Sequence, residues 1–242
     1  MKGTELLKAV VKQYIGTDHI TEDEFAQIGR AITRSFRNLY KAYHAKEPGY
    51  TAKDHSERVT EIVFDWENYE VRIKRQEREF KLTQLQFLKF LNLIEICYGK
   101  VLPLGSVIKL DLDLIPEELR KSYHASSASS MFMISGRKSP IRGSFGEYYV
   151  DYVARMYPFG ESEYMQPFLI SSMMIKSVVF EGMKNELEEK FVDTVLREEL
   201  VYKNSRSIGF LLDDEVEQLE QEMYAHEEVI EDGDGSISSG TA

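Results

Sequence analysis

The side chains that most often carry catalysis or bind metal ions are few in this chain and widely separated. There are five histidines and one cysteine among 242 residues. The histidines are His19, His44, His55, His124 and His226. None of them has a second histidine four residues away, which a zinc-protease helix would require. We therefore predict no enzyme activity, no catalytic residue and no metal centre.

Two other patterns that could carry chemistry are also weak. Cys97 lies within the apolar stretch Leu91–Tyr98, which predicts a core position and not a nucleophile. A single cysteine cannot form a disulfide within the chain, and this favours a reducing cytoplasm. The run Gly143–Gly146 has the composition of a turn and is not followed by the Lys-Ser/Thr of a phosphate-binding loop.

One short run near the C-terminus resembles the middle of a calcium loop. It reads Asp-Gly-Asp-Gly-Ser-Ile over 232–237. Aligned as an EF-hand, its first and last ligand positions are Ile230 and Thr241, so the first ligand and the bidentate glutamate are both missing. We predict no calcium binding and no cofactor.

The charge is distributed unevenly along the chain. Lys and Arg number 30 and Asp and Glu number 41, which gives a net charge of −11. The excess acids all lie in 213–242, a segment that contains no Lys or Arg, so residues 1–212 are neutral. This pattern excludes a uniformly acidic protein and a globally basic nucleic-acid binder. No stretch approaches the roughly 18 apolar residues of a membrane-spanning helix.

Hydrophobic periodicity predicts helices and a hairpin in the first hundred residues. Thr21 and Thr83 are each followed three residues later by Glu or Gln, which is the pattern of a helix-capping box. The expected elements are helices at 2–15, from Thr21 to about 45 and from Thr83 to 98. A hairpin is expected at 59–74, with its turn at Glu67-Asn68, and a short third strand at 79–82.

After Gly99 the sequence changes to strands separated by polar loops. The expected elements are strands at 104–111, 131–135, 148–157 and 175–181, one or two helical turns at 117–122, and helices at 185–201 and 213–230. In the helix at 185–201, Leu187, Phe191, Val195 and Leu196 are predicted to face inward. The fold class is therefore α+β, with a helical N-terminal region containing a β-hairpin, then a small curved antiparallel sheet with a C-terminal helix, and an acidic terminal helix. We divide the chain into 1–99, 100–204 and an acidic helix with a disordered tail at 205–242.

Two surface features could bind a partner. Arg30, Arg34, Arg37 and Lys41 form a basic stripe on the predicted second helix. Such a stripe is usually only the solvated face of a helix, and protein contact and nucleic-acid contact are the alternatives. Leu212, Val216, Leu219, Met223 and Ile230 form an apolar seam on the acidic helix. Repulsion between like charges destabilises that helix unless the seam packs on the body or on a partner.

Four blocks between residues 101 and 196 resemble one family. The blocks are Leu102–Leu110, Met131–Arg137, Tyr149–Tyr152 with Tyr157–Glu161, and Ile175–Gly182. They are similar to a small uncharacterised bacterial domain encoded beside LXG polymorphic toxins in type VII secretion loci of Gram-positive bacteria. The resemblance covers about 40% of the chain.

The resemblance implies that the partner is an LXG toxin or a type VII secretion component. We expect a cytoplasmic accessory protein that binds the toxin, as a chaperone or targeting factor, before export. An immunity protein that neutralises the toxin is the first alternative, and a nucleic-acid-binding regulator is the second. An open sheet edge that accepts an added strand would suit the first function. We expect no nucleic-acid partner and no stable membrane insertion.

Overall fold

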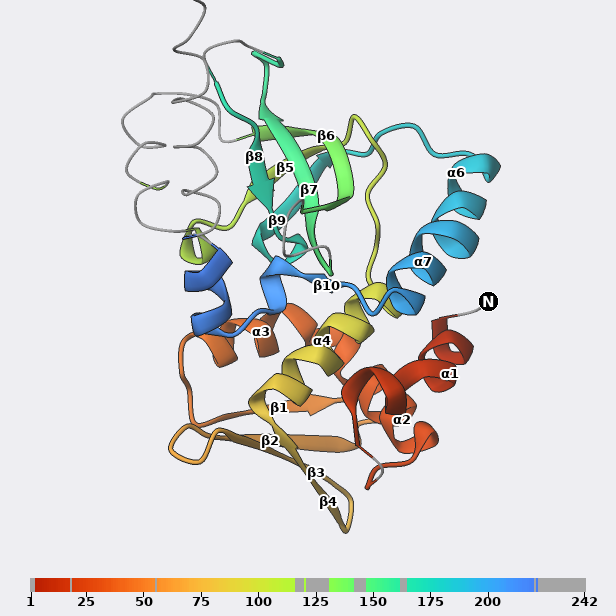
Figure 1. Ribbon diagram of the computed structural model, residues 1–242, viewed down its shortest axis with the longest axis vertical. Coiled ribbons are helices and arrows are strands. Elements are labelled where there is room, and N and C mark those ends of the chain that lie inside the picture. The colour runs from red at the N-terminus through yellow and green to blue at the C-terminus, as the bar shows by residue number, and fades with distance from the viewer. Residues whose placement is uncertain are drawn as a thin grey trace, which may run out of the picture.

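The protein is α+β, as its sequence predicts, with helices and one sheet in its N-terminal half and a second sheet in its C-terminal half (Figure 1). This computed structural model describes residues 3–17, 19–54, 56–115, 120, 131–141, 147–161, 165–219 and 221.

The N-terminal helices are α1 (Gly3–Ile15), α2 (Glu22–Ile32) and α3 (Phe36–His44). The capping box at Thr21 is confirmed, because the Glu24 N–H donates to the Thr21 hydroxyl and the Thr21 N–H donates to the Glu24 carboxylate. The prediction of one long helix from Thr21 to about residue 45 was wrong, because a 3-10 turn, η1 (Thr33–Ser35), separates α2 from α3. The Thr33 hydroxyl donates to the Arg30 carbonyl, and such side-chain to backbone bonds bend or interrupt helices.

The first sheet has four antiparallel strands in sequential order. They are β1 (Gly49–Lys53), β2 (Val59–Asp65), β3 (Glu70–Arg75) and β4 (Arg78–Thr83). The expected hairpin and third strand are present, whereas β1 was not predicted. The predicted two-residue turn is instead a four-residue loop at 66–69, because Asp65 pairs with Glu70.

Helix α4 (Gln84–Tyr98) lies at the centre of the molecule (Figure 1). It begins at the predicted Thr83 capping box, in which Gln86 is the third helical residue. Ten of its residues, spread around the whole helix, are buried. A helix that is buried on every side must have protein on every side, so α4 carries contacts to both halves of the chain.

The second sheet is antiparallel except at one pair. Its strands are β5 (Val107–Leu110), β6 (Met131–Pro140), β7 (Tyr148–Met156), β8 (Phe168–Ile170), β9 (Ile175–Phe180) and β10 (Arg206–Ser207). The order is β10-β7-β6-β5-β9, β8 also pairs with β7, and β10 runs parallel to β7. The four predicted strands are present. Strand β6 continues five residues beyond its predicted end, and β8 and β10 were not predicted.

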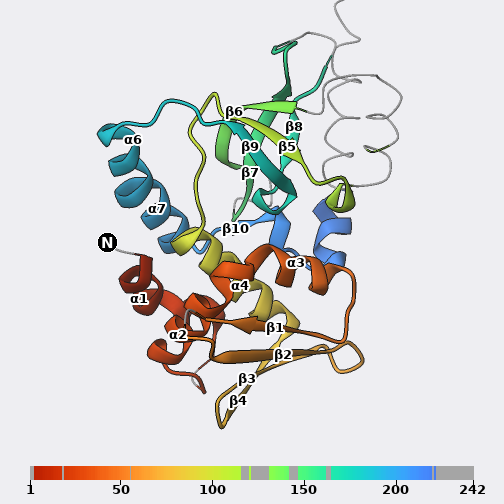
Figure 2. The ribbon, with the colours of Figure 1, turned by 180° about the vertical axis from the view of Figure 1, so that it is seen from behind.

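The C-terminal helix comprises α6 (Glu186–Phe191), a π-helical segment η4 (Val192–Leu196) and α7 (Arg197–Tyr202). The predicted inward orientation was wrong for Leu187, Phe191 and Val195, which are exposed. The π turn inserts a residue and rotates the face that follows it. The first half of the helix also projects away from the body (Figures 1 and 2), so only the second half finds a core to cover it.

One hydrophobic core extends across both halves of the molecule. It contains side chains from α1, α2, α3, α4 and the first sheet, together with Tyr149 of β7, Leu200 and Val201 of α7, and Phe210. Phe210 lies in the 3-10 turn η5 (Ile208–Phe210), within the segment assigned to the tail, and has no exposed surface. The chain at 205–211 therefore contributes to the core.

Replacing Phe210 with alanine should destabilise the whole protein by roughly 3–5 kcal/mol, because it leaves a cavity in the shared core. The free energy of unfolding by urea measures this. Phe159→Ala is the matched control, since Phe159 is 62% exposed, and its effect should stay within about 0.5 kcal/mol. Similar values for the two variants would contradict a shared core that includes 205–211.

Candidate functional site

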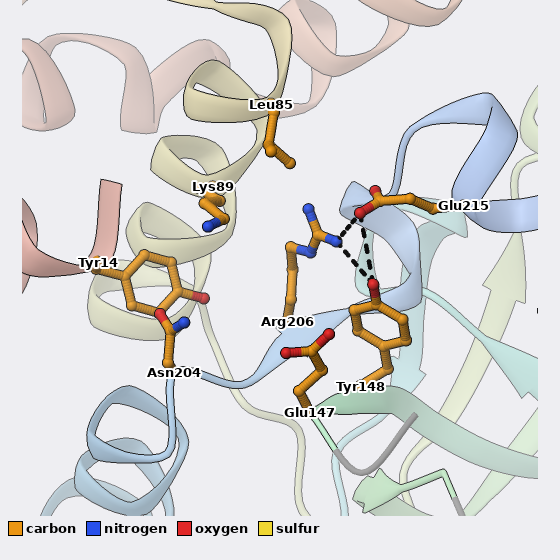
Figure 3. A pocket seen from close by; sticks show the side chains of 8 residues that line it. All are labelled: Tyr14, Leu85, Lys89, Glu147, Tyr148, Asn204, Arg206 and Glu215. Carbon is orange, nitrogen blue, oxygen red and sulfur yellow. Dashed lines mark hydrogen bonds and ion pairs between the residues drawn. The ribbon is translucent and has the colours of Figure 1, made fainter. Parts of the chain in front are cut away.

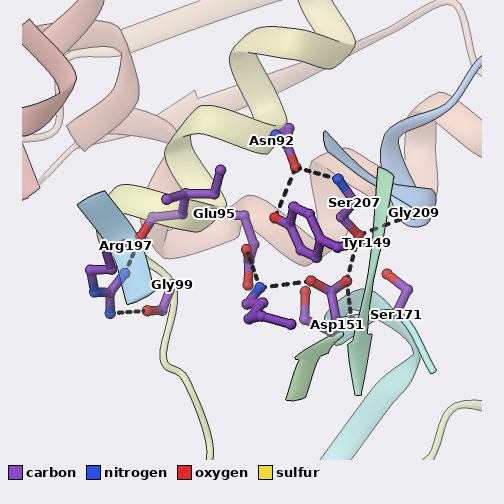
Figure 4. A network of polar contacts seen from close by, with 12 residues as sticks. Asn92, Glu95, Gly99, Tyr149, Asp151, Ser171, Arg197, Ser207 and Gly209 are labelled. Carbon is purple, nitrogen blue, oxygen red and sulfur yellow. Dashed lines mark hydrogen bonds and ion pairs between the residues drawn. The ribbon is translucent and has the colours of Figure 1, made fainter. Parts of the chain in front are cut away.

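A buried ammonium group joins α4 to the second sheet. The Nζ of Lys138 donates to Glu95 Oε2 at 2.8 Å and to Asp151 Oδ1 at 2.7 Å (Figure 4). The Lys138, Glu95 and Asp151 side chains are 1%, 2% and 0% exposed. The other carboxylate oxygen of Asp151 accepts hydrogen bonds from the Ser207 hydroxyl at 2.7 Å and the Ser172 N–H at 3.0 Å. The partner that a mid-strand aspartate requires is therefore Lys138.

The charges in this group depend on one another. Burial raises the pKa of Glu95, and the Lys138 ammonium opposes that rise. Burial alone would lower the pKa of Lys138, but the carboxylates of Asp151 and Glu95 raise it well above its ordinary value. Lys138 therefore stays protonated at physiological pH. With so little exposed surface, the three groups cannot reach a dissolved substrate, so their role is structural.

A second set of hydrogen bonds continues this junction through Asn92. Its side-chain oxygen accepts from the Ser207 N–H at 3.0 Å and from the Tyr149 hydroxyl at 3.3 Å (Figure 4). Its side-chain nitrogen donates to the Ser205 carbonyl at 3.1 Å, which also accepts from the Tyr14 hydroxyl at 2.6 Å. Four elements, α1, α4, β7 and β10, are thus connected by buried polar bonds, and each of these groups has a partner.

The basic stripe is divided by the fold. Arg37 and Lys41 both pair with Asp111 at 2.5 Å, and Arg37 also donates to the Met173 carbonyl at 3.3 Å. These two residues connect α3 to the second sheet and are already engaged within the chain. Arg30 and Arg34 are exposed. The four residues therefore do not form one free surface.

The start of the acidic helix is tied to the body. Residues 213–219 are helical. The Arg206 guanidinium donates to the Tyr148 hydroxyl at 3.0 Å and pairs with the Glu215 carboxylate (Figure 3). Leu219 is buried in a small cluster with Tyr148. This helix therefore does not begin as a detachable segment.

The described residues of the apolar seam also pack on the body of the protein. Leu212 packs on the main core, and Val216 packs on the cluster that contains Leu219. These three seam residues pack on the chain's own body, which was one of the alternatives given for the seam. Met223 and Ile230 lie outside the described residues, as does the calcium-like run at 232–237.

The residues considered for chemistry are not brought together. Cys97 is buried, and burial raises the pKa of its thiol to about 12. His19 and His44 are in separate places, and the other three histidines lie outside the described residues. Within the part of the chain that the structure describes, no three His, Cys, Asp or Glu side chains are arranged to hold a metal ion. The same part contains no helix long and apolar enough to span a membrane.

The most prominent candidate for a binding surface is an apolar band along β9 and α6. Strand β9 lies at the edge of its sheet, pairing with β5, and no other described strand pairs with it. At its beginning, the Arg37 guanidinium donates to the Lys176 carbonyl at 3.4 Å. The chain that carries the side chains of the band runs from β9 through the connecting segment at 181–185 to α6 (Figure 2). Its members and their exposed fractions are Val178 40%, Val179 51%, Phe180 62%, Met183 77%, Leu187 76% and Phe191 40%.

The band is held in place by polar contacts at its back. Arg137 on β6 donates to the Glu188 carboxylate, with one N–O distance of 2.9 Å, and its guanidinium lies 5.5 Å from the centre of the Phe191 ring. The Gly182 N–H donates to the Ser106 hydroxyl at 3.0 Å. Because these contacts fix both the helix and the connecting segment, the exposed apolar side chains belong to an ordered surface. Soluble proteins rarely leave such a band uncovered unless it binds something.

Replacing Lys138 with methionine should destabilise the protein by roughly 3–5 kcal/mol, because Glu95 and Asp151 would remain buried without their cation. Urea unfolding measures the loss. Lys109→Met is the control, since Lys109 lies exposed on β5 of the same sheet, and it should change stability by no more than about 0.5 kcal/mol. Equal stability of the two variants would show that the buried charge does not join the halves.

The similarity of this chain to a known family lies in the second half of the chain. Residues 101–191 match the family model of a domain of unknown function, DUF4176. No curated protein and no solved structure matches the chain. The matched segment contains β5 to β9 and α6, and therefore every residue of the apolar band. The part of this chain that is similar to DUF4176 is thus the second sheet without β10, together with the band.

Proposed function

We propose that this chain binds another protein through the apolar band, which accepts an extended segment of the partner as an added strand on β9. The observation that carries the proposal is the exposure of β9. From Lys176 to Phe180 every side chain is exposed, on both faces of the strand. An edge strand in a protein that works alone is normally short, charged or covered. This one has a single charged residue, Lys176.

The backbone of β9 supports the same mode of binding. Its N–H and C=O groups on one side bond to β5, where Ile108 pairs with Val178 and Lys109 pairs with Ser177. An added strand would bond to the groups on the other side, and the apolar side chains at alternating positions would give specificity. Helix α6 continues the band beyond β9. It would then contact the part of the partner that lies next to the added strand.

The resemblance of residues 101–196 supports a partner class. We propose that the partner is an LXG toxin or a type VII secretion component, and that the chain is a cytoplasmic chaperone or targeting factor which binds the toxin before export. An unfolded or partly folded export substrate offers extended apolar segments, and these are the segments that an open sheet edge accepts.

Val178→Lys should weaken binding to the neighbouring LXG toxin at least tenfold, because an edge lysine opposes strand addition and desolvation of its charge is unfavourable. Co-purification and titration calorimetry with the toxin measure this. Val63→Lys is a closely matched control, because Val63 is 39% exposed against 40% for Val178 and lies on β2 of the other sheet. Equal loss in both variants, or no loss at Val178, would contradict binding at this edge.

Deleting the gene should abolish secretion of the toxin while leaving the cell protected against it. Toxin in the culture medium and survival beside a toxin-delivering strain are the two measurements. Loss of protection with secretion intact would identify an immunity protein instead. Complementing the deletion with the two variants tests whether the lost function depends on the band. The Val63→Lys variant should restore the secretion or protection that the deletion abolished, and the Val178→Lys variant should not.

A further inference from the structure

A cavity of about 560 Å³ lies between α3, the β2–β3 loop and the start of the acidic helix, and no residue of the apolar band lines it. Aromatic side chains form one part of its wall, and two carboxylates form another. The residues used below are Tyr43, Lys46, Trp66, Tyr69, Asp213 and Asp214. Neither the predicted basic stripe nor the binding of a partner at β9 accounts for this combination.

The aromatic wall is held in position. The indole N–H of Trp66 donates to the Glu47 carbonyl at 2.9 Å, which fixes the ring at the end of β2. The Tyr43 ring packs on it, with 5.2 Å between the ring centroids. Burial, with a further contribution from the Asp213 charge, raises the pKa of Tyr43 to about 12. Tyr43 is therefore neutral at physiological pH, and its ring is a permanent part of the wall.

Tyr69 occupies a backbone position where tyrosine is unusual. It is the last residue of the β2–β3 loop and has a φ of 56°, in the left-handed region that favours glycine and asparagine. Its carbonyl accepts from the Gln84 N–H at 3.0 Å, so this conformation is built into the loop. The side chain is nevertheless 70% exposed and contributes little to the core. Packing in the core therefore does not explain the large ring at this position, and its place in the cavity wall is the feature that a ligand would use.

The charge at the cavity is negative. Lys46 is the cation of the wall, and its Nζ lies 3.8 Å from Asp213 Oδ2. Asp214, in contrast, forms no ion pair with any residue that the structure describes. One carboxylate therefore remains for a ligand, in a cavity that aromatic rings also line. The faces of aromatic rings attract cations.

We propose that this cavity binds an organic cation, a guanidinium or alkylammonium group, between the Trp66 and Tyr69 rings and the Asp214 carboxylate. The cation could be the side chain of a peptide or a free small molecule, and the chemistry of recognition is the same for both. This site is independent of the proposed binding at β9.

Trp66 is the single tryptophan of the chain, so its fluorescence reports this cavity alone. The full-length protein is titrated with N-acetyl-arginine amide, with choline, and with N-acetyl-citrulline amide as the neutral isostere of the first, at constant ionic strength. Saturable change with either cation and none with citrulline supports the site. Response to the arginine derivative alone assigns it to peptide side chains, and response to choline alone assigns it to small quaternary ammonium ligands. No saturable change with either cation, or an equal response to citrulline, overturns the proposal.

Two variants separate binding from folding. Tyr69→Gly removes the ring but suits the left-handed backbone, so it should weaken cation binding at least tenfold while thermal stability is kept or increased. Asp214→Asn should weaken binding to a similar extent. Glu67→Gln is the control for charge, because Glu67 lies in the same loop but does not line the cavity, and it should bind as the unaltered protein does. Unchanged binding in Tyr69→Gly, with Trp66 fluorescence otherwise intact, would overturn the assignment.

Discussion

The rest of the structure depends on the ammonium group of Lys138, which lies between Glu95 of α4 and Asp151 of β7 with almost no exposed surface. Withdrawing three charged groups from water is unfavourable, and their mutual attraction offsets this only when the geometry is good. The hydrogen bonds from Lys138 to Glu95 and Asp151 can therefore form in only one arrangement of α4 against the sheet. We interpret the network as a device that selects this docking, with the surrounding apolar core providing most of the stabilisation. The backbone of Lys138 is itself left-handed, with a φ of 45°, so β6 is distorted where it delivers this side chain.

This docking determines which surfaces remain for a partner. The α4 side of the second sheet is covered by the N-terminal half, and β10 with the first turns of the acidic helix completes the β7 end through Arg206 and Glu215. At the opposite end of the sheet lies β9, exposed on both faces. The C-terminal helix contacts the core through its second half, where Leu200 and Val201 are buried, and leaves Leu187 uncovered. The uncovered band is thus a consequence of how the halves are joined.

Local patterns in the sequence predicted much of the fold. Both capping boxes begin helices, because Thr at the cap and Glu or Gln three residues later form bonds that depend only on nearby chain. The alternation of Ile62 and Phe64 predicted a strand for the same reason. Strand β1 was missed because Gly49 and Lys53 are poor strand residues, and its register is set by pairing with β2. The inward face of the helix at 185–201 was wrong because periodicity cannot reveal a π turn or the absence of a covering core.

The sites were harder to predict than the elements. Asp151 is an acid within an apolar strand, where an acid is disfavoured without a partner. Its partner Lys138, however, lies in the polar run Ser-Gly-Arg-Lys-Ser-Pro, which is typical of a loop. Its two partners are 43 and 13 residues away, so only the folded chain brings them together. In the sequence, Arg37 and Lys41 cannot be distinguished from charged residues on the solvated face of a helix. Their partner Asp111 lies in the second half of the chain, and only the fold brings it near. The exposure of β9 is likewise a property of sheet order, which no short pattern contains.

Hydrogen–deuterium exchange of the full-length protein, with and without the proposed LXG toxin partner, tests the central proposal most directly. Binding by strand addition should slow exchange of the backbone amides of β9 and of the connecting segment at 181–185, and leave the first sheet, β1 to β4, unchanged. Slowed exchange confined to β1 to β4, or no change at β9 in a complex that demonstrably forms, would contradict the proposal that this edge receives the partner.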